Sequence, residues 1–243
     1  MNRQAPSLKD NGLIPDYKVT GDIALQKQKT LRRLVGVLGM LLPILLYGTL
    51  LVDSKFTRVL ASISHYYFTR ASGIFVICVS LLAIFLLIYK GEALVDYILS
   101  SLAGIAALVV VLFPTNNLFN LMNGKYNAVN VTILKEGVAR SQFHYVCAAV
   151  FLLSLAIMSF FLFTKSDQPG SKRKRKKVFR NRIYRFCAII MVMALLVILF
   201  GYLKIIPPAD YDSYELTFWM EVIAIEAFGF SWLVKGGVLF QDD

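Results

Sequence analysis

The chain has 243 residues, of which 57% are hydrophobic and only 17% are charged. A soluble domain of this length carries more charge and interrupts its apolar runs sooner, so the composition excludes an ordinary soluble protein. Several apolar runs approach or exceed the ~18–20 residues that cross a ~30 Å hydrocarbon core. We therefore predict an all-α, multi-pass membrane protein.

Six apolar runs define the predicted helical bundle, which occupies residues 34–237. The spans are expected at about 34–52, 73–89, 93–113, 143–163, 186–206 and 216–234. Residues 1–33 are polar and basic, as in a cytoplasmic tail, and residues 238–243 form a second short cytoplasmic tail.

A basic segment between the fourth and fifth spans sets the predicted orientation. Its core is Lys172, Arg173, Lys174, Arg175, Lys176 and Lys177. Basic clusters next to spans stay on the cytoplasmic side and contact anionic lipid headgroups. Both termini then lie in the cytoplasm, and 19 of the 26 Lys and Arg residues lie on that side of the cell membrane. We therefore attribute the formal charge of +11 to contact with anionic membrane lipids and not to binding of nucleic acid.

Two glutamates interrupt the sixth predicted span. Glu226 falls near its middle and Glu221 about one and a half turns closer to the outside. A charge at the bilayer centre costs about 2.5–3.5 kcal/mol on insertion scales, so we expect Glu226 to face the bundle and be protonated or paired. The two side chains should point about 140° apart, at ~100° per residue. Glu226 is the first candidate for a proton, ion or pocket site, and a hydrogen-bonded packing role is the alternative.

Asp96 lies about one turn into the third predicted span. Ser100 and Gly104 follow it at intervals of four and give that face small, polar side chains. Such faces are typical of helix packing in lipid. We interpret the three residues as packing and anchoring groups.

Polar residues are concentrated at the predicted outer boundary of the membrane, where the second, fourth and sixth spans begin. They are Ser62, Ser64, His65, Tyr66, Tyr67, Ser141, His144, Asp210, Asp212 and Glu215. Histidines, carboxylates and serines at one level are compatible with an intramembrane hydrolase. However, an open tetrahedral zinc site usually needs three protein ligands, and the chain has only two histidines. We therefore expect no metal and no cofactor, and an interfacial polar belt is the simpler interpretation.

Several short sequence segments, taken together, resemble an uncharacterised family of bacterial six-span membrane proteins. They are Ser62-Ile63-Ser64 with Tyr66, Tyr67 and Thr69; Leu102-Ala103-Gly104-Ile105; Leu112-Phe113-Pro114-Thr115; Arg180-Asn181 with Ile183-Tyr184-Arg185; Phe218-Trp219 with Glu221; and Phe228-Gly229 with Ser231-Trp232-Leu233, Lys235 and Gly236. The resemblance covers roughly residues 34–237 and implies six spans, but no chemistry and no catalytic residues.

These observations favour a non-enzymatic membrane protein with a polar, outward-facing pocket for a lipid, a small amphiphile or an ion. The candidate pocket residues are Glu226, Glu221, His144, His65, Tyr66 and Tyr67. A hydrolase that uses the two histidines is the alternative, and a structural or effector role in the membrane is a third possibility.

Overall fold

Six long helices dominate the computed structural model, which describes residues 22–91, 93–119, 121–165 and 175–240. Within these ranges there is no β-strand. The long helices are α1 (Asp22–Ser54), α2 (Ser72–Ile88), α3 (Leu94–Leu112), α4 (Val138–Ile157), α5 (Arg175–Tyr202) and α7 (Leu216–Lys235). The described part of the chain therefore confirms the predicted all-α class.

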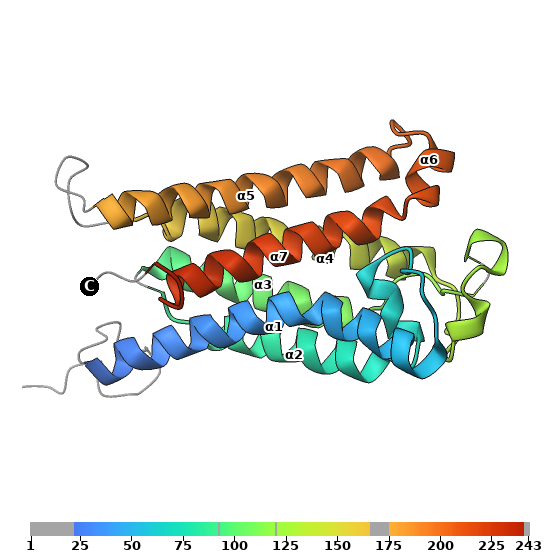
Figure 1. Ribbon diagram of the computed structural model, residues 1–243, viewed down its shortest axis with the longest axis horizontal. Coiled ribbons are helices and arrows are strands. Elements are labelled where there is room, and N and C mark those ends of the chain that lie inside the picture. The colour runs from blue at the N-terminus through green and yellow to red at the C-terminus, as the bar shows by residue number, and fades with distance from the viewer. Residues whose placement is uncertain (1–21, 92, 120, 166–174, 241–243) are drawn as a thin grey trace, which may run out of the picture.

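The six helices form a closed ring in which each packs against its neighbours in the chain (Figure 1). The ring closes where α7 packs between α5 and α1. Buried apolar side chains from every helix form one core, in which Trp232, Tyr184 and Phe228 are among the largest fully buried residues. The first and last helices of the ring therefore lie next to each other.

Five segments within the described residues are long and apolar enough to span a membrane. They are Gln28–Ser54, Leu94–Leu112, Val138–Leu162, Arg175–Tyr202 and Leu216–Lys235. The apolar helix α2 has 17 residues and falls just short of that length. The chain thus has the architecture of a multi-pass membrane protein, whereas the sixth span and the cytoplasmic position of both termini stay predictions.

Glycines allow the closest helix contacts. A Cβ atom on Gly36 of α1 would lie 2.8 Å from the carbonyl oxygen of Gly229 on α7, and one on Gly229 would lie 2.8 Å from that of Gly36. Likewise, a Cβ on Gly104 of α3 would lie 2.8 Å from the carbonyl oxygen of Ala83 on α2. Backbone atoms cannot move aside as a flexible side chain can, so both crossings require glycine.

Two helices begin well before the apolar runs that predicted them. The charged segment before the first run is helical from Asp22, and the basic segment is helical from Arg175. Each of these two apolar runs begins inside its helix, because charged flanks can continue a helix beyond an apolar run. Of the basic segment, Arg175, Lys176 and Lys177 start α5, whereas Lys172, Arg173 and Lys174 lie outside the described residues. Residues 1–21 and 241–243 of the predicted tails also lie outside them.

Short helices fill one end of the bundle, which we call the loop end. They are η2 (Ile63–Phe68), η3 (Leu121–Gly124), η4 (Asn127–Val129) and α6 (Pro208–Ser213). The opposite, tail end holds the start of α1 and the end of α7 (Figure 1). There α4 continues into a π-helical turn, η5 (Met158–Leu162). The predicted topology would place the loop end outside the cell.

Candidate functional site

The loop end holds a group of polar residues that we call the loop-end cluster: Ser62, Ser64, His65, His144 and Glu221. The segment 62–65, which begins η2, contributes the first three, α4 contributes His144, and α7 contributes Glu221. The backbone N–H of Ile63 donates to Glu221 Oε2 at 2.6 Å. Because the first N–H groups of a short helix lack internal partners, a carboxylate at this position caps the helix. Glu221 thus attaches η2 to the end of the bundle.

Each histidine in the cluster is hydrogen-bonded to a serine. Ser62 Oγ lies 2.9 Å from His65 Nδ1, and Ser64 Oγ lies 3.0 Å from His144 Nε2. His144 Nδ1 also lies 2.9 Å from the carbonyl oxygen of Phe113. A carbonyl only accepts, so Nδ1 carries the proton and Nε2 accepts from Ser64. The base-like nitrogen of His144 therefore faces a serine hydroxyl.

Burial keeps the His65 side chain neutral. The residue is only 8% exposed. Burial, with a smaller contribution from the nearby His144, lowers the pKa of His65 from 6.5 to about 4. His65 Nε2 is buried and has no hydrogen-bond partner among the described residues. This atom is thus a buried polar atom of the cluster whose hydrogen-bonding capacity is unused.

The two adjacent tyrosines differ in environment. Tyr66 is fully buried and packs on Phe218 of α7, with ring centroids 6.1 Å apart. Burial raises the pKa of its hydroxyl above the usual range. Tyr67 is half-buried and contacts Phe68 and Phe75 edge to face. Both anchor η2 through their rings, so the structure assigns them a packing contact beside the cluster.

A second polar group lies nearby at the start of α7. Glu215 accepts from Tyr126 Oη at 2.5 Å and pairs with Lys125. Its backbone lies in the left-handed region (φ 50°), which is strained for a residue with a Cβ. Burial and the bond to Glu215 both raise the pKa of Tyr126. Of the other predicted boundary residues, Asp210 and Asp212 are exposed on α6, and Ser141 bonds the side chain of Asn116.

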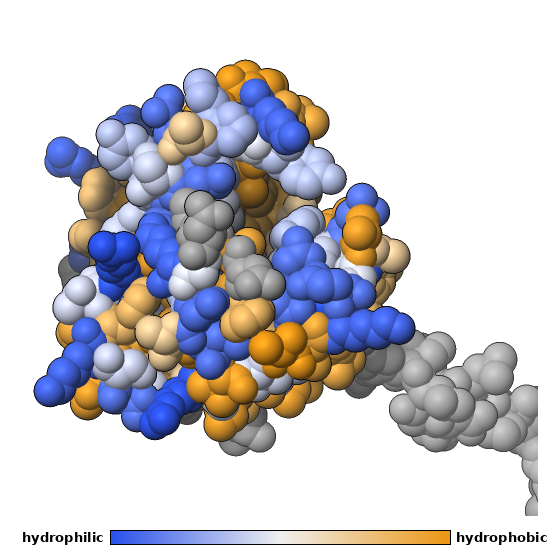
Figure 2. Space-filling view, turned by 90° about the vertical axis from the view of Figure 1, so that its right-hand side faces the viewer, coloured by the Kyte–Doolittle hydropathy of each residue, from blue (hydrophilic) through white to orange (hydrophobic). Residues whose placement is uncertain are grey.

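The surface of the loop end is mainly hydrophilic, with apolar residues along its edge (Figure 2). Figure 2 also shows a hollow in the upper part of this face, with apolar residues at its floor. A polar surface around an apolar floor suits a molecule that has a polar and an apolar part.

Glu226 lies apart from the loop-end cluster. It follows Glu221 by five residues, a rise of about 7.5 Å along α7. The residues at i−3 and i−7, Ile223 and Trp219, are 41% and 47% exposed. Glu226 is itself half-buried, and it makes no hydrogen bond or ion pair to another described residue. The expectation of a site in the bundle interior has no support from these contacts.

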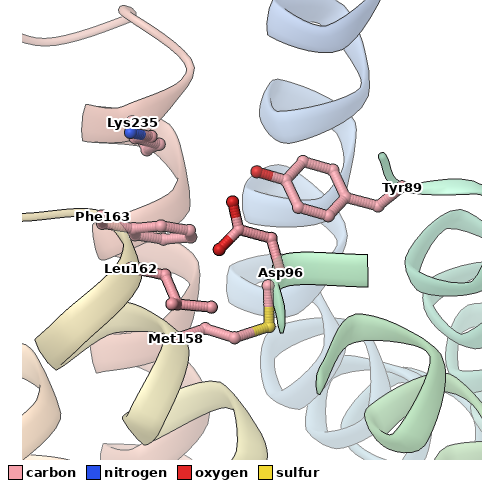
Figure 3. Close-up of a pocket in the computed structure, with 6 residues that line it drawn as sticks. All are labelled: Tyr89, Asp96, Met158, Leu162, Phe163 and Lys235. Carbon is pink, nitrogen blue, oxygen red and sulfur yellow. The ribbon is translucent and has the colours of Figure 1, made fainter. Parts of the chain in front are cut away.

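The predicted anchoring group lies at the tail end, where Figure 3 shows Asp96 in a cleft with Tyr89, Phe163 and Lys235. Asp96 Oδ2 accepts from the backbone N–H of Ala93 at 3.1 Å and so caps α3. Its other oxygen lies 3.6 Å from Lys165 Nζ. Ser100 Oγ donates to the Tyr89 carbonyl at 3.2 Å. With Gly104 at the α2–α3 crossing, all three predicted residues occupy packing or capping positions.

The described residues include no group of three or more His, Cys, Asp or Glu side chains placed to hold a metal ion. No known family, curated protein or solved structure matches the chain. The functional argument therefore depends on the geometry of the chain itself.

Proposed function

We propose that this membrane protein binds a lipid or small amphiphile at its loop end and does not change it chemically. The loop-end cluster receives the polar part of the ligand, and the apolar floor of the hollow in the loop-end face (Figure 2) receives the apolar part. The observation that carries this proposal is the buried, unpartnered Nε2 of His65 within a cluster built from three separate segments. Buried polar atoms in proteins are nearly always satisfied, so one without a partner indicates a missing ligand or water.

The chemistry of the cluster limits the ligand. His65 is neutral, because its pKa is lowered to about 4, and it offers one hydrogen bond. Glu221 already accepts a hydrogen bond from the backbone N–H of Ile63, so it is not a free countercharge for a cation. These groups suit a hydroxyl or carbonyl oxygen better than a free ion. Among the candidates from the sequence, an uncharged lipid or amphiphile group fits best.

Lipid analysis of the purified protein tests the proposal. Wild-type protein is extracted from native membranes, reconstituted in nanodiscs and analysed for co-purified molecules by mass spectrometry. We expect one class of amphiphile in near-stoichiometric amount, depleted several-fold in His65→Phe. Tyr89→Phe is the matched control, because it removes a buried hydroxyl, bonded to Arg32, at the tail end. Equal recovery from His65→Phe and wild type would contradict the proposal.

A second function, hydrolysis, is favoured by one specific contact. Ser64, His144 and the Phe113 carbonyl reproduce the order of nucleophile, base and orienting group found in serine hydrolases. In that mechanism, Ser64 Oγ attacks an ester carbonyl, its proton passes to His144 Nε2 and then to the leaving alcohol. Water would release the acyl group in a second step.

A fluorophosphonate probe separates the two functions. If the protein only binds, the probe does not react with it. If it is a hydrolase, the probe labels Ser64, and Ser64→Ala or His144→Ala abolishes the labelling. Ser62→Ala is the matched control, because Ser62 pairs with the other histidine.

A further inference from the structure

Glu226 combines three features that the proposed function does not explain. It lies near the middle of α7, about 15 Å from either end of the helix at ~1.5 Å per residue. A glutamate side chain is too short to reach the water from there. Its carboxyl group also has no hydrogen-bond or ion-pair partner among the described residues. A carboxyl at this depth is expected to be neutral and to have a partner.

The surface around Glu226 faces away from the core. Towards the core, α7 buries Ala224, Phe228 and Trp232, each no more than 1% exposed. Ile223 and Trp219 flank Glu226 on the outer side of the helix and are 41% and 47% exposed.

Across the α1–α7 contact, Gly39 of α1 lies against Phe228, two residues after Glu226. The side chains that flank the carboxyl group on α7 are thus apolar and face away from the core.

We propose that Glu226 pairs with Glu226 of a second copy of this chain, so that the α1–α7 face forms a symmetric dimer in the membrane. A neutral carboxyl group has one donor and one acceptor, and it is therefore complementary to itself. A two-fold axis places the same residue of both copies opposite each other, and two hydrogen bonds form in place of two unsatisfied polar groups. The exposed side chains of Ile223 and Trp219 supply the surrounding contact.

Disulfide cross-linking in native membranes tests this dimer. The three native cysteines are first replaced by alanine, because Cys147 is not fully buried. Ile223→Cys and Phe230→Cys then place a thiol on the Glu226 face, one turn to either side. Met193→Cys is the matched control, since Met193 is 54% exposed on the neighbouring helix α5. We expect oxidised dimers from at least one of the first two variants and none from the control.

Substitution of Glu226 tests whether the carboxyl group causes the association. Glu226→Leu should lower the cross-linked fraction about tenfold, the effect of losing two interhelical hydrogen bonds. Glu226→Gln should keep it within about twofold, because an amide also donates and accepts. Photobleaching of labelled protein in liposomes should give two steps per particle for wild type and one for Glu226→Leu.

Three results would overturn the proposal: no cross-link on the Glu226 face, equal cross-linking through Met193→Cys, or dimers that persist in Glu226→Leu. Contact with lipid alone gives the first result, and non-specific collision gives the second. A dimer held only by apolar contacts gives the third. The cross-linking comparison between faces uses chains that retain Glu226, so it decides the question even if Glu226→Leu fails to insert.

Discussion

The two ends of the bundle satisfy their polar groups in different ways. At the tail end, the carboxylate of Asp96 caps its own helix through Ala93, three positions earlier in the chain. At the loop end, Glu221 and Ile63 are 158 positions apart, and Ser64 and His144 are 80 positions apart. The tail-end cap can therefore form together with α3, whereas the loop-end cluster requires most of the bundle to be assembled. The difference predicts that the loop end is the more easily perturbed end.

Acid should expose this difference most strongly. Because the pKa of His65 is lowered from 6.5 to about 4, the unfolded chain takes up a proton that the folded protein excludes. The contribution of neutral His65 to the free energy of unfolding is fully present above pH 6.5 and is lost as the pH falls towards 4. At about 1.36 kcal/mol per pH unit, it amounts to roughly 3 kcal/mol. Thermal unfolding of detergent-solubilised protein against pH should show this decline, and His65→Phe should flatten it. Parallel curves for the two proteins would contradict the assignment.

Removal of the carboxylate that holds η2 should have the next largest effect. Glu221→Leu leaves the Ile63 N–H without its acceptor, and a buried donor left unsatisfied costs about 1–3 kcal/mol. We expect a loss of about 2 kcal/mol and rapid hydrogen exchange in residues 63–68. Glu226→Leu is the control on the same helix, and its monomer should change by less than ~0.5 kcal/mol, because no described contact is lost. Similar losses in both variants would mean that Glu221 has no special role.

At the tail end the corresponding change should cost less. Asp96→Ala removes the cap of α3, which is worth about 1 kcal/mol. Because that contact is local, exchange should increase only in the first turn of α3 and leave η2 unchanged. Increased exchange at the loop end would show that the two ends are coupled.

The smallest effect is expected for Lys165→Ala. The Lys165 side chain is 43% exposed, and exposed ion pairs contribute at most ~1 kcal/mol. A loss of a few tenths of a kcal/mol in chemical denaturation is expected. A loss as large as that of Asp96→Ala would show that the ion pair, and not the cap, fixes the carboxylate.

The sequence predicted the helices well, because long apolar runs and their flanking charges are local signals. The predicted run 93–113 and the helix Leu94–Leu112 differ by one residue at each end. Counting spans also placed the two histidines at the same level. The helix η2 was not predicted, because its polar sequence looks like a loop and its stability comes from Glu221, far along the chain.

Other parts of the site had no local signal. The orienting group of His144 is a backbone carbonyl, which any residue could supply at position 113. The role of Tyr126 depends on Glu215, 89 positions away. Glu221 itself carried a usable signal, since a carboxylate in an apolar run requires a partner. The sequence could not identify that partner as a main-chain N–H group.

The contact between Gly36 and Gly229 has a consequence for biosynthesis. The two residues are 193 positions apart, so a ribosome that adds ~5–20 residues per second needs roughly 10–40 s to make the second after the first. During that time α1 has already entered the membrane, and its glycine-lined face contacts lipid or a chaperone. The ring can close only after the last helix has been inserted. Truncation before α7 should therefore yield chains that insert but are degraded, because their first helix never finds its neighbour.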